Sequence, residues 1–251
     1  MIAQWRLFLA ALRSFTRLPV SAGTMATLPA EASARFLPLV GVVVGIIGGA
    51  IYWLSAQFWP TSVAVIVSML ATVLITGGAH EHGLVETITK LRAASNPKRV
   101  LESQWDSATH SFSVLAILFV VFIKYNTLMA LSAANLSFAL PANTALTLLL
   151  IAGHGASRAL LVSVITPDVQ SPSQRVSMAE LSFALVTGFV PAAILGLPGL
   201  IGLVAAIVMR MVLVAYVKHR IKTAESACFG ATQQLTEACF YLGALATWTY
   251  V

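Results

Sequence analysis

Long apolar stretches recur along this chain and are separated by short polar segments. A helix of about 20 apolar residues crosses a bilayer, and by this length seven stretches predict membrane-spanning helices. They cover residues 36–58, 61–79, 112–134, 144–166, 180–197, 199–217 and 235–251. Before them, Arg6, Arg13 and Arg17 stand among apolar residues, which predicts an N-terminal interfacial helix. The pattern predicts an all-helical, polytopic membrane bundle that forms a single domain over residues 1–251.

Composition supports this interpretation and excludes other classes. Hydrophobic residues make up 58% of the chain and charged residues 10%, far from the values of soluble globular proteins. The net charge of +6 does not indicate a nucleic-acid partner, because the basic residues flank apolar stretches. The two cysteines, Cys228 and Cys239, suggest neither a disulfide framework nor a thiolate metal site.

Basic residues gather at alternate ends of the apolar stretches. They precede the first stretch and occupy the segments between the second and third, fourth and fifth, and sixth and seventh stretches. The turns near 59, 137–143 and 198 contain none. Since Lys and Arg are retained on the cytoplasmic side during insertion, we expect a cytoplasmic N-terminus and a C-terminus on the opposite side.

Two further features concern packing and loop length. Gly41, Gly45 and Gly49 are spaced by four residues, which predicts a helix face that another backbone approaches closely. The longest polar segment, about 80–111, is predicted to be a cytoplasmic loop with a functional role.

The end of the second stretch combines a flexible dipeptide with ionisable side chains. Gly77 and Gly78 predict a bend where the chain leaves the membrane. Four ionisable residues follow within seven positions: His80, Glu81, His82 and Glu86. On a helix His82 and Glu86 would share a face. Two interpretations stay open, a solvated polar boundary and a metal and phosphate site.

The far end of this polar segment carries Asp106 and Ser107, just before the third stretch. Because both ends of the segment are tied to neighbouring spans, we expect Asp106 to approach the segment 80–86. The alternative is a simple helix cap.

Later spans carry buried charge. His154, Ser157 and Arg158 lie on adjacent turns of the fourth stretch, and an Arg within a span normally faces a polar cavity or a partner. It could hold a phosphate, or form an ion pair with Glu237. Lys124 in the third stretch could line the same cavity or extend to the interface.

The beginning of the seventh stretch is polar, with Gln233, Gln234 and Glu237. Four separate parts of the chain therefore bring polar side chains to one membrane face, and we expect them to form a single site at the cytoplasmic surface.

In this order and spacing, these segments resemble the cobalamin synthases, the adenosylcobinamide-GDP ribazoletransferase family of integral membrane proteins. The resemblance covers nearly the whole chain. It rests on 14–20, 36–41 with Gly45, 76–84, Asp106–Ser107, Lys124, Ser157–Arg158 and 230–234.

The resemblance implies an enzyme of the bacterial inner membrane whose active face is cytoplasmic. It implies that α-ribazole or its 5′-phosphate is joined to adenosylcobinamide-GDP with release of GMP, and that Mg²⁺ assists. The predicted catalytic residues are His80, Glu86, Asp106 and Arg158. The predicted substrate-binding residues are Ser107, Lys124, Ser157, Arg158, Gln233, Gln234 and Glu237. The predicted metal ligands are Glu86 and Asp106, with Glu81 and His82 in reserve.

The chain departs from the family pattern in its acidic motif, where three aspartate positions are occupied by His82, Glu86 and Thr89. The alternatives are a diverged, catalytically impaired homologue that binds a corrinoid or nucleotide-like ligand, and a small transporter. A homo-oligomer is compatible with every one of these interpretations.

Overall fold

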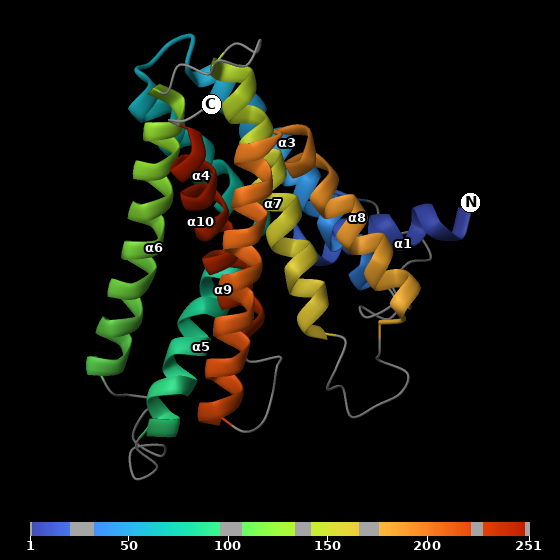
Figure 1. The fold of residues 1–251 in the computed structure, drawn as a ribbon, viewed down its shortest axis with the longest axis vertical. Helices are drawn as coiled ribbons and strands as arrows, with labels where there is room; N and C mark the ends of the chain where they lie inside the picture. Colours follow the sequence, from blue (N-terminus) through green and yellow to red (C-terminus); the bar gives the residue numbers. More distant parts are fainter. Residues whose placement is uncertain are drawn as a thin grey trace.

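The computed structural model describes residues 2–20, 33–95, 107–133, 142–165, 176–221 and 228–248, and these form an all-helical membrane bundle (Figure 1). Its elements are α1 (Ile2–Phe15), η2 (Ala34–Phe36), α3 (Leu37–Ser55), α4 (Thr61–Thr76), α5 (Ala79–Ser95), α6 (Ser107–Ala133), α7 (Ala142–Ile165), α8 (Met178–Ile194), α9 (Leu197–Ile221) and α10 (Phe229–Trp248).

Each of the seven apolar stretches forms a helix, as predicted. Within the described ranges, four helices are long and apolar enough to cross a membrane, and five if the bent pair α4 and α5 counts as one span. The predicted number of seven crossings is therefore not reached on length and composition alone. Helix α8 has 17 residues, about 25 Å at 1.5 Å per residue, and the first turns of α10 are polar.

Helix α5 corrects the prediction of a loop at 80–111. Residues Ala79–Ser95 are helical, because their apolar side chains Leu84, Ile88 and Leu91 belong to a core shared with α6, α9 and α10. The predicted bend is confirmed. Gly77 and Gly78 have φ values of 65° and 67°, and α5 leaves α4 at 81°. Positive φ is favourable at glycine and costly for other residues.

The glycine spacing in α3 lets the backbone of α7 approach closely, as predicted. Gly41, Gly45 and Gly49 all face α7. A methyl group at residue 41 would lie 2.9 Å from Cδ of Arg158, and one at residue 49 would lie 2.5 Å from Cγ2 of Thr147. Helix α3 therefore fixes the height and rotation of α7, which carries Arg158.

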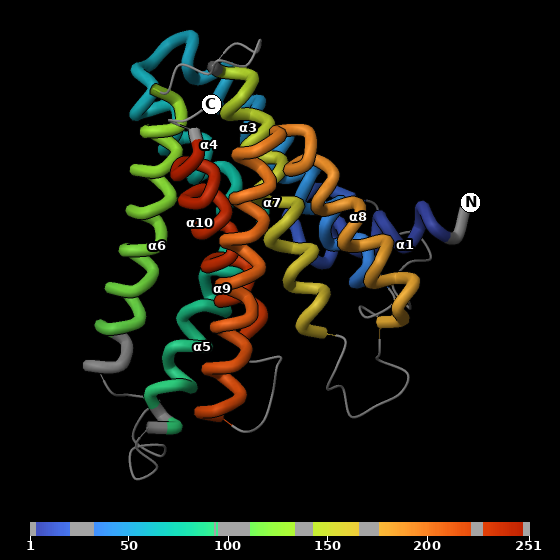
Figure 2. Tube along the Cα trace, viewed as in Figure 1, coloured from blue at the N-terminus to red at the C-terminus, as the bar shows by residue number. Residues whose placement is uncertain are grey.

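The arrangement of the remaining helices places α10 in contact with α5, α6, α7 and α9. Helix α6 lies at one edge of the bundle, whereas α1 and α8 lie at the opposite edge (Figure 2). The C-terminal ends of α5, α7 and α9 point towards the same end of the molecule (Figure 1). This alternation agrees with a multi-pass chain.

The N-terminal segment is attached to the bundle at two places. The backbone N–H of Arg17 donates to the carbonyl of Ile75 at 2.6 Å, and Arg35 forms an ion pair with Glu180 of α8 at 3.1 Å. Helix α1 forms as predicted, and its interfacial position stays a prediction.

Candidate functional site

A cavity of about 450 Å³ lies among α4, α5, α6, α7 and α10. Its outer part is lined by aliphatic and aromatic side chains of α4 and α6. The polar residues that line it are Ser68, Thr72, Thr76, His80, Glu81, Lys124, His154, Arg158, Gln233, Gln234 and Glu237. Side chains from five helices thus meet at one place.

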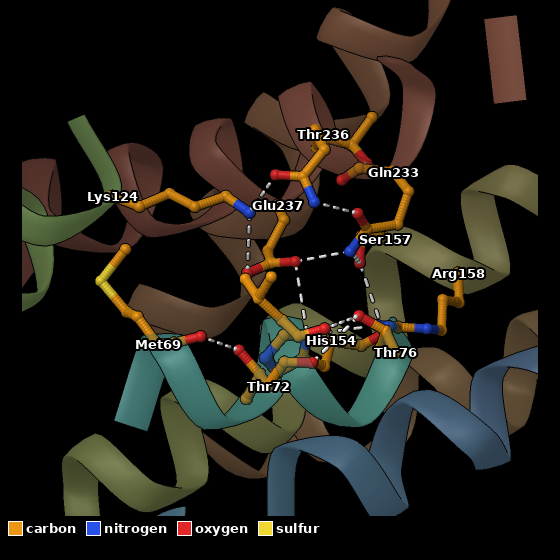
Figure 3. Close-up of polar contacts among 12 residues, drawn as sticks. Met69, Thr72, Thr76, Lys124, His154, Ser157, Arg158, Gln233, Thr236 and Glu237 are labelled. Carbon is orange, nitrogen blue, oxygen red and sulfur yellow. Dashed lines mark hydrogen bonds and ion pairs between the residues drawn. The ribbon is translucent and has the colours of Figure 1, made fainter. Parts of the chain in front are cut away.

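Glu237 is the centre of the polar contacts (Figure 3). Its Oε1 lies 3.1 Å from Nζ of Lys124, and its Oε2 lies 3.3 Å from Nδ1 of His154. Gln233 donates to the same Oε2 at 2.5 Å, and the hydroxyl of Tyr241 donates to Oε1 at 3.3 Å. A buried carboxylate needs such partners, because an unpaired charge in an apolar interior is very costly.

Arg158 is 1% exposed and is held by the preceding turn of its own helix. Its NH1 lies 3.1 Å from Nδ1 of His154 and donates to the His154 carbonyl at 3.2 Å. Glu237 forms its direct ion pair with Lys124. His154 lies between Glu237 and Arg158 and contacts both. The arginine was predicted either to face a cavity or to pair with Glu237, and it lines the cavity.

Gln234 connects α5, α6 and α10. Its amide donates to Oε1 of Glu81 at 2.8 Å, while its carbonyl oxygen accepts from Lys124 at 2.7 Å. The contact between α5 and α10 is possible because Gly83 and Gly230 face each other. A methyl group on Gly83 would lie 2.8 Å from the Cα of Gly230. The small residues therefore let Glu81 reach the cluster.

Two buried polar atoms of this site have no hydrogen-bond partner among the described residues, Oε2 of Glu81 and Nε of Arg158. An unsatisfied buried polar atom costs about 1–3 kcal/mol. An unsatisfied buried atom in a native protein calls for a cause, such as a catalytic role or a bound water or ion. The residues that line the cavity therefore include one acceptor atom and one cationic donor atom that no described residue satisfies.

Comparison with known proteins shows the family of this chain. The profile of the family described as cobalamin-5-phosphate synthase matches residues 7–245. The chain belongs to the cobalamin-5-phosphate synthase family. The predicted family resemblance is thereby confirmed over nearly the whole length.

Individual relatives in the family agree. The chain is 31% identical to the adenosylcobinamide-GDP ribazoletransferase of Shewanella amazonensis, over 97% of this chain and 96% of the relative. It is 35% identical to the protein of that name from Leptothrix cholodnii, over 98% and 97%. The corresponding protein of Ralstonia pickettii is 31% identical over 96% of both chains. No solved structure is significantly similar.

For this family member, the structure divides the predicted metal ligands between two faces of α5. Glu81 lines the cavity. His82 and Glu86 share an exposed face, as their spacing predicts, and Glu86 binds Lys90 at 2.6 Å. Asp106 lies outside the described residues. Within those residues no three His, Cys, Asp or Glu side chains come together as a metal site.

The other predicted site residues are mostly gathered at the cavity. Lys124, Arg158, Gln233, Gln234 and Glu237 line it together with His80. Ser157 is fully buried behind this lining and accepts from Gln233 at 3.3 Å. Ser107 begins α6, and its side chain lies outside the described atoms.

The charged side chains of the site lie well inside their helices. Lys124, His154 and Glu237 lie in the middle turns of α6, α7 and α10. The position of the site at the cytoplasmic face stays a prediction.

Sequence reasoning missed Tyr241 and the hydroxyl side chains of α4. Tyr241 stands four residues after Glu237, so their shared helix face was a usable signal. Thr72 and Thr76 donate to carbonyls of their own helix, at 2.8 Å to Met69 and 3.0 Å to Thr72. Such hydroxyls give no sequence signal, because a Thr in a helix can donate its hydrogen bond to its own helix whichever way that helix face points.

Proposed function

We propose that this chain is an adenosylcobinamide-GDP ribazoletransferase, which joins α-ribazole or its 5′-phosphate to adenosylcobinamide-GDP and releases GMP. The supporting observation is the full-length match to relatives that bear this name, found in a chain whose cavity holds two buried cations, Lys124 and Arg158. Phosphoryl transfer is catalysed mainly by positioning and by stabilising charge on the phosphate oxygens, and these side chains fit both tasks.

The proposed reaction is a substitution at phosphorus. A hydroxyl oxygen of the ribazole forms a bond to the phosphorus that stays with the corrinoid, and the bond from that phosphorus to GMP breaks. The electron pair leaves with GMP. Arg158, with its free Nε, holds the phosphate, Lys124 contributes positive charge, and His80 accepts the hydroxyl proton.

The family resemblance implies a magnesium ion, and the described residues alone do not form a site for one. Glu81 is the carboxylate of the cavity lining that has an oxygen without a partner among the described residues, since Glu237 is fully engaged. We propose that Mg²⁺, when bound, neutralises phosphate charge and is held by Glu81 and Asp106. Glu86 and His82 stay predicted ligands, although their face of α5 is exposed.

The proposed setting is the bacterial inner membrane, with the N-terminus in the cytoplasm and one membrane domain over residues 1–251. The proposed partners are the corrinoid nucleotide, α-ribazole or its phosphate, and the lipid bilayer, without nucleic acid. Basic residues at alternate ends of the apolar stretches support this orientation.

A second candidate is a homologue that binds the corrinoid or nucleotide-like ligand without turnover. The observation in its favour is that two predicted metal ligands, His82 and Glu86, lie on the exposed face of α5, where Glu86 pairs with Lys90.

The deciding experiment uses purified protein in lipid nanodiscs with adenosylcobinamide-GDP, α-ribazole and Mg²⁺, and measures GMP. We expect GMP release, and we expect Arg158→Ala to lower kcat/KM by about 100-fold or more. Arg210→Ala is the matched control. Arg210 is also an arginine within a span, bound to Ser163 at 2.8 Å away from the cavity, so its kcat/KM stays near wild type.

The outcomes separate the two candidates. Retained corrinoid binding without GMP would support the non-catalytic homologue, whereas equal losses in both variants would remove the assigned role of Arg158. Chelation with EDTA tests the metal, and we expect GMP release to stop and to recover when Mg²⁺ is restored.

A further inference from the structure

The mouth of the cavity lies between α4 and α6. Five apolar side chains line the cavity and are also exposed on the outside of the protein. They are Ile66 and Leu70 of α4 and Leu118, Val121 and Phe122 of α6, with exposed fractions between 40% and 63%. Residues that are both cavity lining and outer surface mark the place where the cavity opens.

The surface around this opening has the character of a lipid-facing surface. On α4 the outward stripe consists of Val63, Ile66, Leu70 and Leu74. On α6 it includes Leu115, Leu118, Phe119 and Phe122. An exposed apolar face of this kind is typical of a surface that contacts a membrane or a partner. Since both helices belong to predicted membrane-spanning segments, the cavity opens sideways into the hydrocarbon of the bilayer.

The inner end of the cavity has the opposite character. Lys124, Arg158 and Glu81 lie there, and the last two carry the unsatisfied atoms. An occupant therefore needs an apolar end between α4 and α6 and a hydroxyl-bearing or anionic end at the cluster. The volume of about 450 Å³ suits a single small molecule, and a corrinoid ring with its side chains is too large for it.

We propose that this cavity is the site of the ribazole substrate and that it is open to the bilayer. The assignment rests on the proposed function. Ribazole is a benzimidazole riboside, so it joins a flat apolar ring to a hydroxyl-rich sugar. Its ring lies between α4 and α6 near Leu70 and Leu118, and its ribose is directed towards Lys124 and Gln234. The corrin ring does not occupy this space, and the phosphate of the corrinoid nucleotide meets the ribazole at the inner end, beside Arg158.

The test fills the mouth with a larger side chain. Leu118→Trp adds volume on the cavity side of α6, and Phe119→Trp, one residue along and exposed to 65% without lining the cavity, is the matched control. Radiolabelled α-ribazole binding is measured by equilibrium dialysis with protein in nanodiscs, in the absence of corrinoid. We expect the Kd to rise at least tenfold in Leu118→Trp and to stay within twofold of wild type in Phe119→Trp.

Turnover is measured on the same samples and keeps the two hypotheses separate. We expect Leu118→Trp to raise the KM for α-ribazole and to leave the KM for adenosylcobinamide-GDP unchanged. One outcome would overturn the cavity assignment and leave the proposed function intact. In it the wild-type protein releases GMP, and Leu118→Trp leaves ribazole binding unchanged. Ribazole binding that responds to Leu118→Trp without any GMP release would overturn the function and leave the binding site.

A second variant guards against misfolding. Leu70→Trp fills the same mouth from α4, and thermal unfolding of every variant is compared with wild type. If Leu118→Trp unfolds, Leu70→Trp decides by the same binding criterion. The proposal would also be overturned if the cavity holds lipid. In that case wild type retains a phospholipid, the tryptophan variant loses it, and ribazole binding is the same in both.

Discussion

Glu237 carries an unusual share of the interactions at the site. It balances the charge of Lys124, contacts Nδ1 of His154, and accepts hydrogen bonds from Gln233 and Tyr241. A carboxylate surrounded in this way is already satisfied, so its main task is to hold the neighbouring cations in place. The groups left for a ligand are then Glu81 and Arg158.

This division of roles predicts the effect of removing Glu237. Glu237→Ala leaves the ammonium of Lys124 without its anion and Nδ1 of His154 without its carboxylate neighbour in an apolar interior, and breaking a buried ion pair costs about 3–5 kcal/mol. We expect a large fall in thermal stability of the detergent-solubilised protein. Glu86→Gln is the control, because its pair with Lys90 is half exposed and contributes about 0.5 kcal/mol or less. Equal, small changes in both variants would mean that the cluster does not support the fold.

At the residue scale, the sequence predicted which charged residues belong to the site better than it predicted which groups surround them. Lys124 and Arg158 stood out because charge within an apolar stretch is expensive and must meet a polar site. The spacing of His82 and Glu86 correctly placed them on one face of a helix. Spacing gives no information about which way that face points, and the structure turns it away from the cavity.

At the scale of elements, the packing of α3 against α7 makes the position of Arg158 depend on Gly41. Gly41→Ala would bring a methyl group against the backbone of His154 and Cδ of Arg158. Overpacking of this kind costs about 1–3 kcal/mol. We expect lower thermal stability together with a loss of GMP release that exceeds the loss of folded protein.

Ile46→Ala is the control for this variant, since Ile46 lies on the same helix and is 49% exposed. Its stability and kcat/KM should stay close to wild type. If Gly41→Ala has wild-type stability and activity, the contact between α3 and α7 is more adaptable than the geometry indicates, and α3 does not fix Arg158.

Helix α5 shows the limit of hydropathy at this scale. The seven apolar stretches were found because apolar length is visible in the sequence. Residues 80–95 contain His80, Glu81 and Lys90 and were predicted as loop, yet they are helical. Their burial depends on contacts with α10, about 150 residues later in the chain, and no local pattern contains that information.

For the whole molecule, the orientation in the membrane is testable with introduced thiols. In a background of Cys228→Ala and Cys239→Ala, His219→Cys and Gln57→Cys are placed at opposite ends of the bundle. We expect a membrane-impermeant maleimide to label Gln57→Cys in intact spheroplasts. His219→Cys should be labelled only in inverted vesicles, because Lys and Arg remain on the cytoplasmic side. Labelling of both positions from the same side would contradict the alternating topology.

The global class of the protein followed from its sequence, and the shape of its cavity did not. An excess of apolar residues with alternating basic flanks specifies a polytopic bundle. The site lies in the middle turns and opens between α4 and α6. Both features depend on the rotation of the helices and on the 81° bend between α4 and α5. The two glycines predict that the chain bends but not in which direction.

The pairing of α5 with α10 has a consequence for how the protein is made. Glu81 receives its hydrogen bond from Gln234, and Lys124 receives its counter-charge from Glu237, so both wait for the helix that is synthesised after all their other neighbours. A nascent chain that has emerged only as far as α9 carries its polar side chains into the bilayer without their partners. The binding site is thus incomplete until α10 docks against α5, α6 and α7.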